Sequence, residues 1–315
     1  MSSAHRGKAY FALFLTSFIW GTTWIASKMG LPGIHALYYA GIRQTLAGAC
    51  FILFFVIRKQ AVWPTLREWA YLLGMGFILF VISNAMTLWS VKYINSGLSA
   101  ILGAVFPIWV AIIDWLIGDK DKPHLLSIAG LILGFAGVTI IFYEHLEEFS
   151  SRGFVTGVLL QTVATLAWAI GTVIMSRRTV KLNRYYSLGW QMLLAGCVLN
   201  LVCYFGGLSI PLSQVQPHTW ISIAYMILFG SIIAFSALLY SLQHLPTTLA
   251  SIYAYINPIV AVVLGHYILG ESWSVSLLAG AIVTLIGVYM VNSGFRKYIR
   301  QMEAQDNSAK ESGRK

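Results

Sequence analysis

The feature that most limits how this 315-residue chain can fold is an internal duplication. Six landmark residues recur in the same order after 148 to 151 positions. The pairs are Trp20 and Trp168, Gly48 and Gly196, Ser90 and Ser241, Pro107 and Pro258, Gly130 and Gly280, and Gly137 and Gly287. Because the separation drifts by so little, we interpret residues 10–143 and 154–294 as two copies of one unit.

The composition indicates that both copies fold in lipid. Apolar residues make up 58% of the chain and charged residues 10%, whereas about a quarter of the residues in a soluble domain are charged. A membrane-spanning helix needs about 20 apolar residues. Ten such windows occur, at residues 10–29, 34–57, 69–91, 97–117, 124–142, 154–175, 184–206, 219–242, 248–269 and 274–294. The sequence therefore predicts an all-α integral membrane protein with ten transmembrane helices.

Five spans in each copy predict that the second copy enters the membrane upside down relative to the first, as in many secondary transporters. Cytoplasmic loops carry an excess of Lys and Arg. With a cytoplasmic N-terminus, 17 of the 21 Lys and Arg residues lie inside. Residues 1–9 and 295–315 are therefore predicted to be cytoplasmic, and residues 144–153 to form an external linker. The first span pairs with residues 154–175, so we expect it to stay in the mature protein of the cytoplasmic membrane.

The net charge of +10 does not indicate a nucleic-acid partner, because the charges sit at alternate helix ends and not on one face. The expected partners are the lipid bilayer and a small-molecule substrate. The three cysteines, Cys50, Cys197 and Cys203, fall inside predicted spans, where they behave as small apolar residues. No cofactor or metal is expected.

Arg43 is the one Lys or Arg residue near the middle of a predicted span, and Gln44 follows it. Ionisable groups within the hydrocarbon are rare and mark functional sites. The residue 148 positions later is Gln191, so a polar side chain recurs at this depth while the charge does not. Two interpretations stay open: Arg43 holds an anionic substrate group or gates a cavity, or it ties helices together through backbone carbonyls.

Neutral polar residues inside the spans are candidates for lining a cavity or for bonding helices to one another. They are Asn84, Gln161, Asn200 and Asn257. Asn257 is the strongest because Pro258 follows it, and a proline removes one helical hydrogen bond and bends the helix. Pro107 is its counterpart in the first copy. Matching interruptions in two halves point to a substrate site, and we predict that both prolines act as hinges.

Aromatic residues in the spans are mostly packing residues or interface anchors. Trp20 and Trp168 are stronger candidates because they are duplicated and lie beside small residues that leave space around them. An apolar or aromatic substrate group could stack there. The predicted substrate-binding set is Trp20, Trp24, Arg43, Gln44, Asn84, Trp168, Gln191, Tyr253 and Asn257.

Proton coupling has little support in the sequence, because coupling groups usually lie near mid-depth. Asp114 and His266 are possible coupling residues, but each falls near the end of a predicted span. A solvated Asp114 and a packed His266 are the simpler interpretations. An intramembrane enzyme is disfavoured, since the chain has no HExxH or GxSxG motif and no cluster of Cys and His.

The order and spacing of several short motifs resemble the EamA branch of the drug/metabolite transporter superfamily, over about residues 10–294. These features are Trp20-Gly21, Arg43, the Ala100–Pro107 stretch with its repeat at Ser251–Pro258, Gly270-Glu271, Gly280 and Gly287-Val288. The first copy has Gly118-Asp119 where the second has Gly270-Glu271. The resemblance implies a carrier that exports amino acids or related small metabolites by alternating access around a cavity between the halves. A channel or facilitative pore stays open as the alternative.

Overall fold

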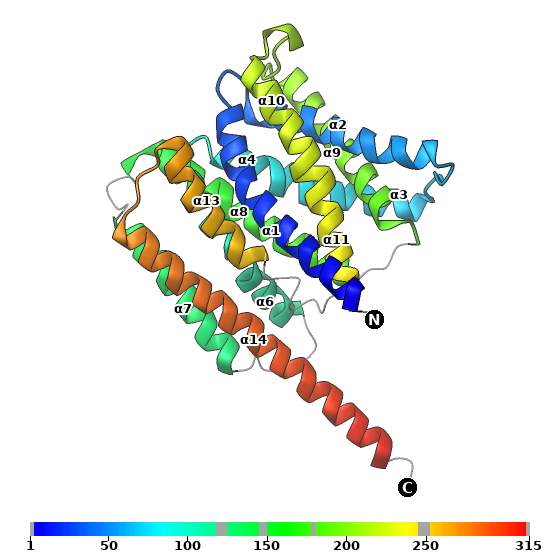
Figure 1. Ribbon diagram of the computed structural model, residues 1–315, viewed down its shortest axis with the longest axis vertical. Helices are drawn as coiled ribbons and strands as arrows, with labels where there is room; N and C mark the ends of the chain where they lie inside the picture. Colours follow the sequence, from blue (N-terminus) through cyan, green and yellow to red (C-terminus); the bar gives the residue numbers. More distant parts are fainter. Residues whose placement is uncertain (1–2, 118–124, 145–149, 178–180, 245–252, 313–315) are drawn as a thin grey trace.

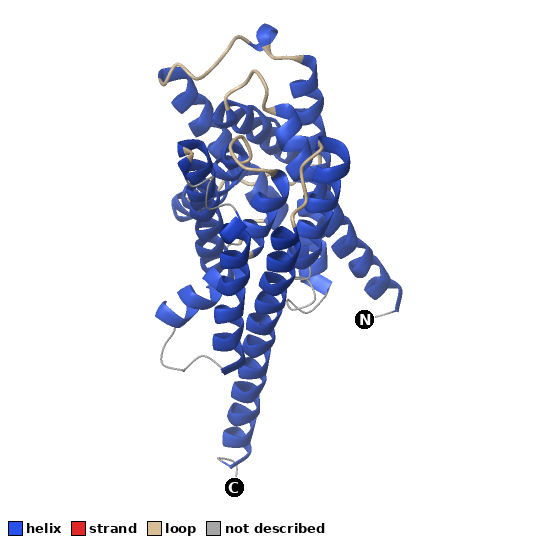
Figure 2. Ribbon diagram, turned by 90° about the vertical axis from the view of Figure 1, so that its left-hand side faces the viewer, coloured by secondary structure: helices blue, strands red, loops and turns tan. Residues whose placement is uncertain are grey.

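The computed structural model describes residues 3–117, 125–144, 150–177, 181–244 and 253–312. All regular elements within these ranges are helical, as Figure 2 shows. Figure 1 labels the longer ones by number. The helices are α1 (Ser3–Gly30), α2 (Ala36–Ile57), α3 (Leu66–Gly76), η1 (Phe77–Asn84), α4 (Ala85–Ser90), α5 (Ser96–Ala104), α6 (Phe106–Ile117), α7 (Leu125–Glu144), α8 (Arg152–Arg177), α9 (Arg184–Phe205), η3 (Leu212–Gln214), α10 (Pro217–Tyr225), η4 (Met226–Ile233), α11 (Ala234–His244), α13 (Tyr253–Leu269) and α14 (Val275–Ser312).

Seven helical stretches of the described chain are long and apolar enough to cross a membrane. They are Gly7–Gly30, Ala36–Ile57, Leu66–Ser90, Arg152–Met175, Arg184–Phe205, Pro217–Ser241 and Val275–Gly294. Three further apolar stretches are shorter, Ser96–Val110, Leu125–Ile141 and Ile256–Leu269. The all-helical fold predicted from the sequence is confirmed, whereas ten full spans stay a prediction.

Two helix pairs pack through small residues, one on each side of the molecule. In Figure 1, α7 runs beside α14 along one edge, and α2 packs on α9 at the opposite edge. A Cβ atom added at Gly137 would lie 2.7 Å from the carbonyl oxygen of Gly280, and one added at Gly48 would lie 2.6 Å from that of Gly189. Neither position has room for a side chain, so glycine sets how closely the backbones of these helices approach.

The packing of the first copy recurs in the second. Helix α1 packs against α13 and α11, and its counterpart α8 packs against α6 and α4. A second recurrence is an eight-residue π-helical segment in each copy, η1 and η4, which begin 149 positions apart. Both contain the tripeptide Ile-Leu-Phe. π-Helical turns are rare and occur often at functional sites.

The two duplicated prolines interrupt their helices differently. Pro107 stands in the first turn of α6, directly after a break at Val105 that separates α5 from α6, and the amide of Ile108 donates back to the carbonyl of Val105 at 2.9 Å. Pro258 lies within α13, where it cannot donate the usual hydrogen bond to the carbonyl four residues earlier. The predicted hinge function of both residues rests on these interruptions.

The terminal helices extend beyond the predicted spans. Helix α1 begins at Ser3, inside the predicted N-terminal segment, and α14 continues from Val275 to Ser312 through most of the predicted tail. The start of α1 and the far end of α14 lie toward the same side of the molecule in Figure 1. The loop that joins α13 to α14 lies on the opposite side.

Candidate functional site

A cavity of about 160 Å³ lies in the middle of the helices, between the two copies. It is smaller than the roughly 300–1,000 Å³ of pockets for drug-sized ligands, so its size suits a small metabolite. Its lining residues are Trp20, Thr23, Trp24, Ser27, Arg43, Ser83, Asn84, Thr87, Leu88, Val91, Ala100, Gly103, Ala104, Phe106, Gln161, Ala164, Thr165, Trp168, Met226, Gly230, Phe235, Tyr253, Asn257 and Pro258. Both π-helical segments contribute to this wall.

Five aromatic rings gather at one end of the cavity, which we call the aromatic end. They are Trp20, Phe106, Trp168, Phe235 and Tyr253. The ring of Trp20 lies 5.0 Å from that of Phe235 and 5.1 Å from that of Tyr253, both edge to face, and 6.3 Å from that of Trp168. These are favourable geometries for aromatic pairs. The duplicated tryptophans predicted from the sequence therefore meet across the interface between the copies.

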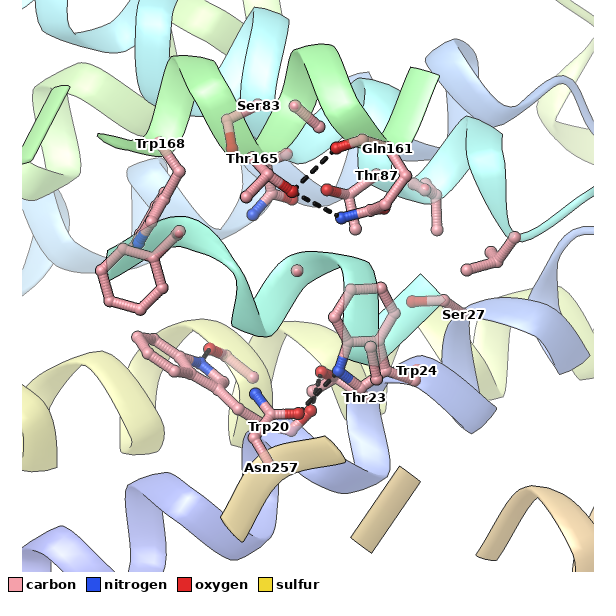
Figure 3. A pocket seen from close by; sticks show the side chains of 18 of the residues that line it. Trp20, Thr23, Trp24, Ser27, Ser83, Thr87, Gln161, Thr165, Trp168 and Asn257 are labelled. Atoms are coloured by element: carbon pink, nitrogen blue, oxygen red, sulfur yellow. Dashed lines mark hydrogen bonds between the residues drawn. The ribbon is translucent and has the colours of Figure 1, made fainter. Parts of the chain in front are cut away.

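Two indole N–H groups fix the position of α1 in this wall. Trp20 Nε1 donates to the carbonyl of Gly230 at 3.1 Å, and Trp24 Nε1 donates to Asn257 Oδ1 at 2.7 Å. Figure 3 shows Trp20, Trp24 and Asn257 on one wall of the cavity and Trp168 on the opposite wall. The proline-flanked Asn257 thus links α13 to α1 and also faces the cavity.

The opposite end, which we call the polar end, is formed by Ser27, Thr87 and Gln161 (Figure 3). Gln161 is 1% exposed, and its Oε1 atom accepts hydrogen bonds from Ser90 at 2.9 Å and from Ser99 at 3.0 Å. Its Nε2 atom donates to Thr165 Oγ1 at 3.2 Å. The amide of Gln161 is therefore held in one orientation by three helices.

Arg43 lies in the cavity wall at 3% exposure. Its Nη2 atom donates to Asn84 Oδ1, which also accepts from Gln44 Nε2 at 3.3 Å. The Nε atom of Arg43 is buried and has no hydrogen-bond partner within the described residues, and neither does the Oε1 atom of Gln44. Arg43 is therefore a buried cation without a counter-charge among the described residues, an arrangement that is costly.

Other predicted residues lie elsewhere. Gln44 is buried beside Asn84 but is not one of the lining residues. Gln191 is buried on α9, also away from the cavity wall. Pro107 is buried in α6 and does not line the cavity, whereas Pro258 does. Asp114 belongs to α6, but its side chain lies outside what the structure describes.

Two further polar residues have structural partners. Asn200 Nδ2 donates to Thr45 Oγ1 at 3.0 Å, between α9 and α2, away from the cavity. The ring of His266 lies 4.5 Å from that of Trp273, and its Nδ1 atom is 2.9 Å from the carbonyl of Glu271. His266 is therefore packed at the end of α13, and a coupling function for it stays a prediction.

An ion pair that no sequence pattern predicted lies next to the polar end. Lys28 Nζ contacts Glu271 Oε1 at 2.7 Å, with side-chain exposures of 32% and 11%. The carboxylate also accepts from the amide and the hydroxyl of Ser96, at 2.8 and 2.7 Å, at the start of α5. Lys28 directly follows the lining residue Ser27, so this cluster joins α1, α5 and the end of α13 beside the cavity.

The environment of Glu271 acts on its pKa in two directions. Burial raises the pKa, but hydrogen bonds from Lys28 and from the amide and hydroxyl of Ser96 outweigh burial, and they hold the pKa below its ordinary value. Gly270 precedes Glu271 and has a φ of 67°, in the left-handed region that commonly ends a helix. The backbone amide of Glu271 donates to the carbonyl of Gly265 at 3.1 Å. The Gly270-Glu271 pair in the sequence was the signal for this site.

The described part of the chain is all-helical, with seven candidate spans around a polar and aromatic cavity, which is typical of a multi-pass membrane protein of the transporter class. The chain belongs to the EamA-like transporter family, whose model matches residues 7–143 and again residues 155–293. Because its relatives are transporters by name, it is a membrane transporter, a class of proteins that are usually not enzymes.

Several relatives match most of the chain. An uncharacterized inner membrane transporter of Escherichia coli K12, YedA, is 30% identical over 289 residues, with 91% of each chain covered. An uncharacterized transporter of Archaeoglobus fulgidus is 25% identical, over 91% of this chain and 98% of that one. A WAT1-related chloroplastic protein of Arabidopsis thaliana is 25% identical, over 87% of this chain and 67% of that one. A solved crystal structure of a protein aligns with a TM-score of 0.64 at 16% identity, over 91% of this chain and 97% of that one, which shows a shared fold.

Proposed function

We propose that this protein is a secondary transporter that exports small amphipathic or amino-acid-like metabolites across the cytoplasmic membrane. The observation that carries the proposal is one metabolite-sized cavity lined by residues of both sequence copies, with a buried Arg43 and six aromatic side chains in its wall. Such a site between two halves is the usual location of a substrate in transporters built from repeats.

The mechanism that we propose is alternating access between two inverted five-helix repeats. The copies would rock about the interrupted helices at Pro107 and Pro258, with both chain ends in the cytoplasm. The recurrence of helix packing and of the π-helical segments supports two equivalent units. Along α1, Trp20 of the aromatic end lies nearer the N-terminus than Ser27 of the polar end, and Lys28 with its partner Glu271 follows Ser27. In the proposed cycle, each state would open one of these two ends.

Solute counterflow in proteoliposomes tests this function. Internal unlabelled solute should accelerate uptake of the labelled solute if the protein is a carrier, whereas an open pore would give no acceleration. A pore is the second candidate, and this result separates the two.

A cavity-filling substitution shows whether the solute passes through the proposed site. Ala164 is fully buried in the cavity wall, so Ala164→Leu should reduce counterflow at least tenfold. Ala279→Leu places the same group on the exposed surface of α14 and should leave counterflow unchanged. Loss of counterflow in both variants, or in neither, would argue against the cavity as the path.

A further inference from the structure

We infer that the substrate is a small organic monoanion, a carboxylate joined to a flat apolar group, whose carboxylate binds Arg43. This inference rests on the proposed function, because it takes the central cavity as the substrate site. Three features of the wall lead to it: the charge of the lining residues, the free hydrogen-bonding groups, and the position of the aromatic rings.

The charge of the cavity wall is positive. Arg43 is the one charged residue in the described lining, and it carries no carboxylate partner within ion-pair distance among the described residues. Guanidinium and carboxylate form strong, charge-assisted hydrogen bonds of matched geometry. An anion in the cavity would therefore supply the missing counter-charge, whereas a cation would meet a like charge.

The neighbours of Arg43 fit a positioning function. Asn84 Oδ1 accepts from both the Nη2 atom of Arg43 and the Nε2 atom of Gln44, and this holds the guanidinium in place beside the cavity that Asn84 also lines. A guanidinium has five N–H donors, and the buried Nε atom is one that has no partner within the described residues. Within the described residues, no backbone carbonyl accepts a hydrogen bond from Arg43, so the contacts do not support the alternative in which Arg43 ties helices together in that way.

The wall offers little to a substrate ammonium group. The Oε1 atom of Gln161 already accepts two hydrogen bonds, its full number of lone pairs, and Asn257 Oδ1 accepts one from Trp24. No lining residue that the structure describes is acidic. Adding an ammonium group to the substrate would bury a second charge without a counter-charge, so we expect a simple carboxylate to bind better than the corresponding amino acid.

The apolar part of the substrate is set by the aromatic end. Trp20 and Trp168 approach from α1 and α8, and Phe106 and Tyr253 stack with ring centres 6.1 Å apart. Flat rings offer broad apolar faces at this end, while the small volume limits the ligand to roughly the size of one aromatic ring with a short acidic chain.

A thermal-stability screen on the purified full-length protein tests the inference with four matched probes. They are 3-phenylpropionate, its neutral amide, phenylalanine and phenethylammonium. A ligand that binds only the folded form raises the unfolding temperature by an amount that grows with the ratio of its concentration to its Kd. We expect 3-phenylpropionate to give the largest shift and an apparent Kd at least tenfold lower than that of any other probe. This comparison uses only the unaltered chain, so it holds even where a variant does not fold.

Two variants then show whether the preference for the acid over its amide depends on Arg43. Arg43→Gln should abolish the advantage of the acid over its amide, while Gln191→Ala, at the counterpart position outside the cavity, should retain it. Three results for the unaltered protein would overturn the inference. They are an equal response to acid and amide, a stronger response to the ammonium, and no response to any probe at millimolar concentration. If phenethylammonium or the amide shows counterflow that Ala164→Leu abolishes, the transporter proposal stands and only the substrate class is wrong.

Discussion

The two ends of the cavity are bordered by different kinds of interaction. The aromatic end is held together by ring contacts among Trp20, Trp168 and their neighbours, and the two copies contribute equivalent tryptophans. Beyond the polar end lies the Lys28–Glu271 ion pair, which has no duplicated equivalent among the ion pairs of the described residues. Ring contacts do not depend on pH, whereas an ion pair does. A duplicated framework thus carries different contacts at the two ends of one cavity, and only the ionic contact responds to pH.

The largest expected effect is on the aromatic end. Trp20→Ala removes edge-to-face contacts with three rings and the hydrogen bond to Gly230. Truncations of this size cost about 3 kcal/mol or more. Unfolding of the purified protein in detergent should show this loss, whereas Trp63→Ala, at a tryptophan that is 76% exposed, should change stability far less. Equal effects of the two changes would contradict the packing that we assign to the aromatic end.

A smaller effect is expected beyond the polar end. Glu271→Gln removes the charge that Lys28 and Ser96 bind, and because the carboxylate is largely buried, we expect a loss of about 2 kcal/mol. Lys28→Gln should cost less, and the double variant should cost clearly less than the sum of the two. Additive effects would show that the two charges do not interact, and the polar end would then have no ionic contact to set against the aromatic end.

The pH dependence of stability distinguishes the ion pair from the aromatic end. The pKa of Glu271 is lowered in the folded protein, so its contribution to stability is present above the pKa of the unfolded chain and is lost as the pH falls through the folded value. The stability difference between the unaltered protein and Glu271→Gln should therefore shrink as the solution is acidified. The difference caused by Trp20→Ala should stay constant. A difference for Glu271→Gln that does not change with pH would contradict the charge on this residue.

The smallest expected effect concerns one hydrogen bond. Trp20→Phe retains a ring at the aromatic end but loses the N–H that donates to the carbonyl of Gly230 in η4. A hydrogen bond of this kind contributes about 1 kcal/mol, so this variant should fall between the unaltered protein and Trp20→Ala in the unfolding experiment. A loss as large as that of Trp20→Ala would show that the bond, and not the ring, holds α1 in place.

Much of the fold follows from the sequence, because hydrophobic windows and duplicated landmarks can be recognised without knowing any contact in space. Membership of the EamA-like family and the all-helical architecture were predicted correctly. The duplicated Trp20 and Trp168, and Asn257 beside its proline, do line one cavity. What they bind there stays a prediction.

Other features depend on contacts that no local pattern records. Lys28 and Glu271 are 243 positions apart, and no local pattern in the sequence pairs them, although Gly270-Glu271 marks one of the two partners. Arg43 and Gln191 occupy equivalent positions, yet only Arg43 reaches the cavity, because helix rotation decides which side chain faces inward. The π-helical turns in η1 and η4 arise from packing, although the repeated Ile-Leu-Phe marks their position.

The most direct test of the central claim is to block the cavity chemically and measure counterflow. Thr87 lines the polar end, and a single cysteine can be placed there after Cys50, Cys197 and Cys203 are replaced. Reaction with a small methanethiosulfonate reagent should abolish counterflow, and a transported solute should slow the reaction. Complete labelling with unchanged counterflow would show that the substrate does not pass through this cavity.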